Sequence, residues 1–201
     1  SKGGYLALVR DDGLVGSIYS DYPAQRENIS YGLLESGKLP AGSKAGDYGF
    51  FTTPTPKHIN QDGYLDFVKD TKFSQDRGFH ETAFTLQITT STPNALIYYT
   101  LDGSEPSITN GTLYQSPFGI SSTTCVRARA YKSGLHPTNI DTHTYFFLKD
   151  VVRQSINGQA PNGWPSNSIN GQTISYGMDP DIVGGFNTES DRKSTRLNSS
   201  H

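Results

Sequence analysis

The chain has 201 residues, of which only 33% are hydrophobic, and it contains 21 Gly, 11 Pro, 12 Tyr and 10 Phe. Its formal net charge is -2, and because its 17 Lys and Arg are scattered, no basic stripe is available to a nucleic acid. There is no apolar run of about 18 residues, so we expect no membrane span. The single cysteine, Cys125, excludes an internal disulfide and a Cys-rich metal site. This composition is typical of short strands joined by tight turns, and it predicts an all-β fold.

The first part of the chain contains several short segments with strand character. Residues 5–9 are an apolar run closed by an Asp-Asp-Gly turn, and we expect a strand there that is buried on both faces. Further strands are expected at 14–19 and 29–34. Residues 49–52 then lead into the Thr-Pro-Thr-Pro segment 53–56, where strand pairing should end because proline has no backbone N–H.

Four motifs in this region resemble, in their order, the C-terminal half of a bacterial lamin-tail domain. They are Gly4-Tyr5-Leu6-Ala7-Leu8-Val9, Tyr22-Pro23-x-Gln25, Ser30-Tyr31-Gly32 and Phe51-Thr52-Thr53-Pro54-Thr55-Pro56. The fold of that family is an immunoglobulin-like sandwich. The resemblance implies that residues 1–60 hold only its later strands, so that this first sandwich is incomplete, and we expect a mixed connector at 61–78.

The next region alternates apolar and polar residues with a period of two. Phe84, Leu86 and Ile88 should therefore share one face of a half-buried strand. A strand is expected at 96–101 and a closing strand at 142–147. Between them, Val126, Ala128 and Ala130 alternate with Arg127, Arg129 and Tyr131, so the small apolar residues should face inward and the arginines should face water.

Residues 79–147 closely resemble the chitobiase and β-hexosaminidase C-terminal domain. The motifs are Ile97-Tyr98-Tyr99-Thr100-Leu101-Asp102-Gly103-Ser104-Glu105-Pro106, Gly111-Thr112-Leu113-Tyr114, Val126-Arg127-Ala128-Arg129-Ala130 and Thr144-Tyr145. The resemblance implies a second immunoglobulin-like sandwich, in tandem with the first. In that family the domain is an accessory module that does not carry the glycosidase carboxylates.

Beyond Leu148 the composition shifts to Asn, Gly, Ser and Pro, which predicts a linker over 148–190 with short anchored pieces. Gly163-Trp164-Pro165 and Tyr176-Gly177-Met178-Asp179-Pro180-Asp181 resemble the approach to a spore-coat-H (CotH)-type kinase domain. That family often carries lamin-tail and chitobiase-like modules upstream. Residues 191–201 look like translated sequencing-adaptor read-through, and we exclude them from the fold.

Catalytic chemistry finds little support in the sequence. Asp102 and Glu105 lie three residues apart in a turn, where an aspartate bonds its own backbone, whereas a glycosidase needs two carboxyl groups across a sugar cleft. The histidines lack zinc-ligand spacing, the serines lack a nucleophile elbow, and no glycine-rich phosphate loop occurs. We predict that the chain is not an enzyme and holds no metal or cofactor.

Aromatic side chains provide the one binding hypothesis, because their flat faces could stack on sugar rings while their polar tips form hydrogen bonds. The residues concerned are Tyr98, Tyr99, Tyr114, Tyr131 and Trp164. The competing interpretation is that the tyrosines pack across strands and that Trp164 anchors the linker.

The sequence therefore predicts a non-catalytic, extracellular or cell-surface spacer module that positions a downstream domain of a larger protein. Its partners would be the neighbouring domains of the parent chain. Two alternatives stay open: a carbohydrate-binding accessory module that contacts a cell-surface glycan, and a truncated CotH-type kinase protein that lacks its active site.

Overall fold

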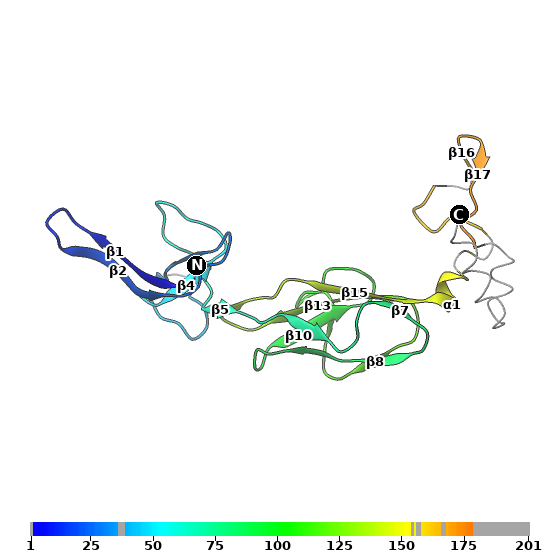
Figure 1. Ribbon diagram of the computed structural model, residues 1–201, viewed down its shortest axis with the longest axis horizontal. Coiled ribbons are helices and arrows are strands. Elements are labelled where there is room, and N and C mark those ends of the chain that lie inside the picture. The colour runs from blue at the N-terminus through cyan, green and yellow to red at the C-terminus, as the bar shows by residue number, and fades with distance from the viewer. Residues whose placement is uncertain (1, 36–38, 154, 156–157, 166–167, 179–201) are drawn as a thin grey trace.

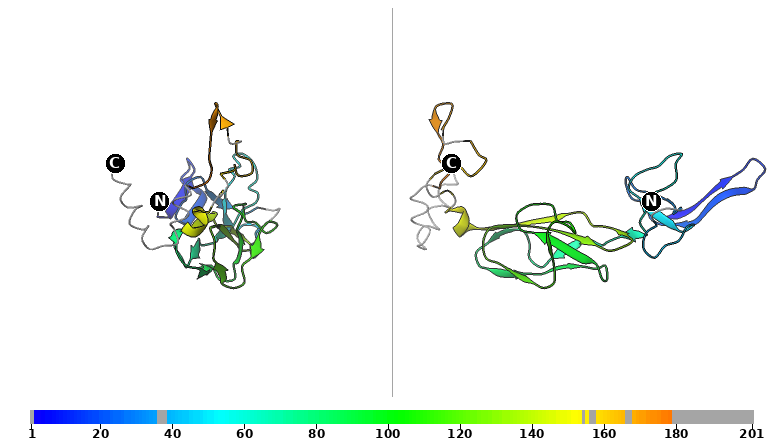
Figure 2. Two further views of the ribbon diagram at one scale, coloured as in Figure 1. Left: turned by 90° about the vertical axis from the view of Figure 1, so that its right-hand side faces the viewer. Right: turned by 180° about the vertical axis from the view of Figure 1, so that it is seen from behind.

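The computed structural model describes residues 2–35, 39–153, 155, 158–165 and 168–178. Almost all of the regular structure is β, with one short helix, α1 (Leu148–Val151), in the described ranges. The molecule is elongated: a hairpin lies at one end, a β-sandwich in the middle, and α1 beyond the sandwich (Figure 1). The view from behind shows the same order (Figure 2). The predicted all-β, sandwich-type fold is confirmed.

The part of the chain before residue 66, here called the N-terminal unit, contains two antiparallel pairs of strands. Strand β1 (Gly4–Val9) pairs with β2 (Val15–Tyr22), and β3 (Ser30–Leu33) pairs with β4 (Tyr48–Phe51). The buried apolar residues of this unit are few, and they lie on or next to β3 and β4: Leu34, Phe50 and Phe51.

The expectation that residues 5–9 are buried on both faces is wrong. Tyr5, Leu6, Leu8 and Val9 are each more than half exposed, with values from 55% to 69%. In the described structure β1 pairs only with β2, and the ring contacts of this hairpin with β3 and β4 involve Tyr19, which leaves the four side chains of β1 exposed. An apolar run predicts a strand here correctly, but burial depends on a covering layer.

One layer of the sandwich is a five-stranded sheet. Its order is β11 (Thr112–Leu113), β10 (Leu96–Thr100), β13 (Thr124–Tyr131), β15 (Asp141–Phe147) and β7 (Gly78–His80). Neighbouring strands are antiparallel except β15 and β7, which are parallel. Strand β13 therefore lies at the centre of the sheet, where it is paired on both sides.

The opposite layer consists of two antiparallel pairs, β8 (Phe84–Leu86) with β12 (Phe118–Ile120) and β6 (Thr71–Phe73) with β9 (Ile88–Thr90). The single strand predicted across 84–89 is thus divided at Gln87. There the chain changes partner, because the Gln87 N–H donates to the Ser74 hydroxyl at 2.8 Å and its carbonyl accepts from the Ser74 N–H at 2.9 Å. Strand β6 comes from the range predicted as a connector, so the sandwich begins earlier than expected.

The core between the layers follows the predicted alternation. Val126, Ala128 and Ala130 are fully buried, and Leu86 and Ile88 face them from the opposite layer. The other buried members of this core are Val68, Ile97, Ile120, Tyr145 and Phe147. The inward set predicted for β13 is confirmed, whereas Arg127 and Arg129 are half-buried and do not face open water.

The described part of the predicted linker begins with ordered structure. In α1, the Asp150 carboxylate accepts a hydrogen bond from the Thr123 N–H at 2.6 Å, and Val152 after the helix is buried. A small hairpin follows, β16 (Ser168–Ile169) with β17 (Gln172–Thr173). The region predicted as read-through, 191–201, lies outside the described residues. Among those that are described, no helix has the length and hydrophobicity needed to cross a membrane.

Candidate functional site

The five aromatic residues predicted to face a glycan do not form one row. Tyr98 and Tyr131 lie on the outer face of the five-stranded sheet, edge to face, with ring centroids 5.9 Å apart. Tyr99 and Tyr114 instead pack against the core, where the Tyr99 ring stacks on Phe118 at 4.5 Å. These four rings are therefore split between two faces of one sheet.

Trp164 lies apart from the four tyrosines, in the segment that follows α1. Its ring meets the Tyr176 ring edge to face at 6.0 Å, and the Tyr176 hydroxyl donates to the Pro165 carbonyl at 3.2 Å. The Trp164 side chain is 64% exposed. The contact joins two segments of the predicted linker and places no other predicted aromatic beside Trp164.

The outer side chains of β13 hold the loop that follows β10. The Arg127 guanidinium donates to the Gly103 carbonyl at 2.9 Å, and Arg129 forms an ion pair with Glu105 at 3.4 Å. The Tyr131 hydroxyl donates to the Pro106 carbonyl at 3.1 Å. The contacts with Gly103 and Glu105 explain why the two arginines are half-buried. The Tyr131 hydroxyl already donates its proton to Pro106, so it cannot donate the same proton to a sugar.

The two carboxylates of this loop are engaged in structural contacts. Asp102 Oδ1 accepts hydrogen bonds from the Ser104 hydroxyl at 2.6 Å and the Ser104 N–H at 3.0 Å, and these bonds lower the pKa of Asp102. Gly103 between them has a φ of 79°, a conformation that favours glycine. No group of three or more His, Cys, Asp or Glu side chains in the described ranges is placed to hold a metal ion.

The most distinctive geometry lies where the N-terminal unit meets the sandwich, here called the junction. Tyr64 exchanges two backbone hydrogen bonds with Phe50 of β4, at 2.7 and 2.8 Å. The next residue, Leu65, already donates its N–H to the carbonyl of Gly134 in the sandwich at 2.9 Å. No residue of free backbone separates the two units.

Two short strands continue this connection into the sandwich. Strand β5 (Asp66–Phe67) runs parallel to β14 (Leu135–His136), and the Val68 N–H donates to the His136 carbonyl at 2.9 Å. The backbone of residues 64–68 is thus paired first with one unit and then with the other.

Aromatic side chains cover the junction. The His136 ring lies 4.8 Å from the Tyr64 ring and 5.4 Å from the Phe67 ring, and Phe67 meets Phe50 edge to face at 5.1 Å. The Arg26 guanidinium lies over the Phe67 ring at 3.9 Å, a cation–π contact from the N-terminal unit. Side chains from both units therefore restrain the angle between them.

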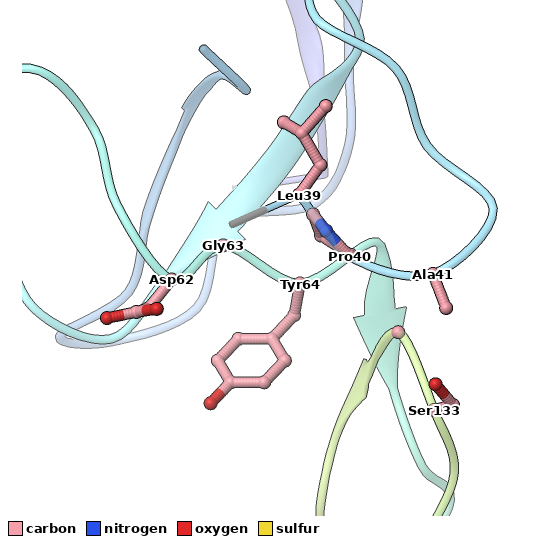
Figure 3. Close-up of a pocket in the computed structure, with 8 residues that line it drawn as sticks. Leu39, Pro40, Ala41, Asp62, Gly63, Tyr64 and Ser133 are labelled. Carbon is pink, nitrogen blue, oxygen red and sulfur yellow. The ribbon is translucent and has the colours of Figure 1, made fainter. Parts of the chain in front are cut away.

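A close backbone approach adds to the junction. A Cβ built on Gly134 would lie only 2.7 Å from the Ala41 carbonyl oxygen, and the φ of Gly134 is +81°. Beside this contact is a cavity of about 360 Å³, lined by Leu39, Pro40, Ala41, Asp62, Gly63, Tyr64, Ser133 and Gly134. Figure 3 shows Ala41 of one unit next to Ser133 of the other, with the Tyr64 side chain pointing away from Leu39.

Sequence reasoning missed the junction. Its connecting backbone, residues 64–68, fell in the range 61–78, which was predicted to be a connector because strands of two residues are too short to show a period. The contacts with Gly134 and His136 join positions far apart in the chain, and no local pattern signals them.

Comparisons with known proteins agree with the sandwich. A family model described as Fn3 associated matches residues 86–145, which lie within the sandwich. No curated protein and no solved structure matched the chain. The match and the observed strands together support an immunoglobulin- or Fn3-like β-sandwich of the accessory type.

Proposed function

We propose that this chain is a non-catalytic spacer in a larger secreted or cell-surface protein, and that it holds neighbouring domains at a fixed relative position. The observation that carries the proposal is the junction, where Tyr64 is bonded to β4 and Leu65 is bonded to the sandwich. Domains joined by a flexible linker move relative to one another by default. A spacer that transmits position must avoid such a linker, and this chain has none at the junction.

The elongated arrangement supports the same role. The β1–β2 hairpin and α1 lie at opposite ends of the molecule, with the sandwich between them (Figure 1). The N-terminal end of the chain lies beside β4 (Figure 1), so a domain attached there would be separated by the sandwich from a domain attached beyond α1. The partners in this proposal are therefore the adjoining domains of the same polypeptide.

The proposal includes the absence of catalytic activity. It is supported by the carboxylates of the 102–106 loop, because Asp102 is bonded to Ser104 and Glu105 is paired with Arg129. Purified chain should turn over neither chitin oligosaccharides nor ATP. Turnover that disappears in Asp102→Asn or Glu105→Gln would contradict this part of the proposal.

The finer family assignment belongs to the proposal as well. We place residues 79–147 with chitobiase C-terminal-like domains and residues 1–60 with the C-terminal part of lamin-tail domains, in a protein of the CotH-type kinase family. The order of the sequence motifs supports this, and the same order supports an extracellular or cell-surface location. Kinase motifs in a longer reading frame would support this family assignment, and they would also fit the alternative function, a truncated kinase protein without its active site.

The rigidity of the junction can be measured directly. In a Cys125→Ser background, Ser17→Cys on β2 and Ser122→Cys at the far end of the sandwich provide exposed sites for spin labels. We expect one narrow distance distribution by pulsed electron paramagnetic resonance. Gly134→Ala should broaden it, because the new Cβ would meet the Ala41 carbonyl.

The matched control is Gly119→Ala, where a Cβ would meet no atom within 4 Å. It should leave the distribution unchanged. A broad distribution in the parent chain would refute the spacer function, and so would a Gly134→Ala distribution as narrow as that of the control.

A further inference from the structure

A second cavity, of about 530 Å³, lies in the N-terminal unit between the β1–β2 hairpin and β3. We call it the tyrosine pocket, and its lining residues are Leu6, Tyr19, Tyr22, Gln25 and Tyr31. None of these residues takes part in the junction contacts described above. Pockets for small molecules commonly have volumes of about 300–1,000 Å³ and combine apolar surface with a few polar groups. The tyrosine pocket has both properties.

The strands of the hairpin place the pocket's side chains. Leu6 and Tyr19 are opposite one another in the β1–β2 register. At the end of β2, the Tyr22 hydroxyl comes so near Gly4 that a Cβ on this glycine would lie 3.3 Å from it. The glycine therefore leaves room for the Tyr22 ring.

Gln25 supplies the carboxamide of the pocket. Its Nε2 donates to the Pro23 carbonyl at 2.7 Å, and this bond leaves the amide oxygen of Gln25 available as an acceptor. The pocket thus combines a carboxamide with three tyrosine side chains.

Two of the three tyrosine rings, those of Tyr19 and Tyr31, are held by contacts with other aromatic rings. Tyr48 of β4 meets Tyr19 edge to face at 5.1 Å and stacks on Tyr31 at 5.7 Å with an interplanar angle of 19°. Tyr31 also contacts the buried Phe50 at 5.1 Å. Rings that are fixed before binding lose little conformational entropy when a ligand arrives.

We propose that the tyrosine pocket binds a sugar ring of a neutral glycan. The flat faces of Tyr19, Tyr22 and Tyr31 would cover the C–H face of the sugar, while the phenol hydroxyls and Gln25 would bond its hydroxyl groups. No Lys or Arg is among the lining residues, so the pocket has no partner for an acidic sugar. The proposal concerns a site separate from the junction, and it does not depend on the spacer function.

The tyrosine pocket fits a sugar better than the aromatics of the sandwich do. In the sandwich, Tyr131 already donates its hydroxyl to Pro106, and Tyr99 is stacked on Phe118. In the pocket, three tyrosines and a carboxamide line one cavity. If the chain binds a glycan, the N-terminal unit holds the site.

The test is isothermal titration calorimetry of the full chain with four neutral probes: cellohexaose, chitohexaose, xylohexaose and mannohexaose. At least one of them should bind. Tyr19→Ala and Tyr31→Ala should each weaken this binding by about tenfold or more, a loss of about 1.4 kcal/mol. The matched control is Tyr5→Ala, which removes an exposed tyrosine of the same hairpin that does not line the pocket, and it should bind like the parent chain.

Because Tyr19→Ala or Tyr31→Ala could disturb the N-terminal unit, Gln25→Ala serves as a second variant. Gln25 is exposed, so its replacement should preserve the amide NMR spectrum outside the pocket and still weaken binding. The proposal is overturned if no probe binds at millimolar concentration. It is also overturned if Tyr98→Ala and Tyr131→Ala abolish binding while the pocket variants retain it.

Discussion

The strongest test of the sandwich introduces the same side chain on opposite faces of its central strand. Ala128 is fully buried on β13, and its cross-strand neighbours in the five-stranded sheet are Tyr99 and Asp141. Its predecessor, Arg127, is on the other face and donates to the Gly103 carbonyl. Ala128→Asp and Arg127→Asp therefore place one carboxylate in the core and one at the surface.

The two substitutions should differ greatly in cost. Ala128→Asp buries a carboxyl group that has no basic partner, which costs about 2–7 kcal/mol for an unpaired polar group and more if it stays charged. Overpacking of the core adds about 1–3 kcal/mol. Domains of this kind are stable by only about 5–15 kcal/mol in total, so most of the stability would be lost. Arg127→Asp removes one hydrogen bond from a half-buried site and should cost about 1–2 kcal/mol.

Thermal unfolding followed by circular dichroism measures the difference. For a domain of about 60–100 residues, 1 kcal/mol shifts the Tm by about 4–8 °C. We expect Arg127→Asp to melt cooperatively about 10 °C below the parent chain, and Ala128→Asp to show no cooperative transition of the sandwich. If Arg127→Asp were the more damaging variant, the inward face of β13 would be the wrong one and the assigned register would be refuted.

Three further substitutions test single contacts. Thr138→Val should destabilise the sandwich by about 1–3 kcal/mol in urea unfolding, because the buried Thr138 hydroxyl accepts a hydrogen bond from the Ala130 N–H. The control Thr142→Val, at an exposed site, should leave the free energy of unfolding almost unchanged. Burial, with a smaller effect of a nearby aspartate, raises the pKa of Tyr145 from 10.0 to about 12. Folding stability should therefore fall as the pH rises from 10 to 12, and Tyr145→Phe should remove the share of this fall that comes from Tyr145. Gly63→Ala should destabilise the N-terminal unit by about 1–3 kcal/mol, since its Cβ would lie 2.5 Å from a buried leucine methyl group.

The sign of the pH dependence predicted for Tyr145 follows from the preference of the folded chain for the protonated hydroxyl. Below pH 10 the hydroxyl keeps its proton in both the folded and the unfolded chain, and the stability that depends on the neutral, buried hydroxyl is fully present. Between pH 10 and 12 the unfolded chain loses this proton first, which favours unfolding. An unchanged slope in Tyr145→Phe would contradict the assignment. Equal losses in Thr138→Val and Thr142→Val, or a Gly63→Ala variant as stable as the parent chain, would contradict the other two predictions.

Local pattern in the sequence was sufficient for the positions of β10, β13 and β15 and for the inward face of β13. The alternation at Val126, Ala128 and Ala130 has a period of two, which only a strand can place on one buried face. The turn at Asp102 and Gly103 was equally predictable, because an aspartate that bonds its own backbone and a glycine with positive φ act over two residues. These features depend on neighbours in the chain.

Tertiary structure decided everything that depends on distant neighbours. The strand at 84–89 is divided because Gln87 meets Ser74. Strand β1 is exposed although it is apolar, and β5 joins the sandwich by pairing with β14. The same is true of the tyrosine pocket, where Tyr19 and Tyr31 come from different sheets. Sequence patterns show which face of a strand is apolar. Which segment covers this face depends on contacts between residues far apart in the chain, and these are seen only in the folded structure.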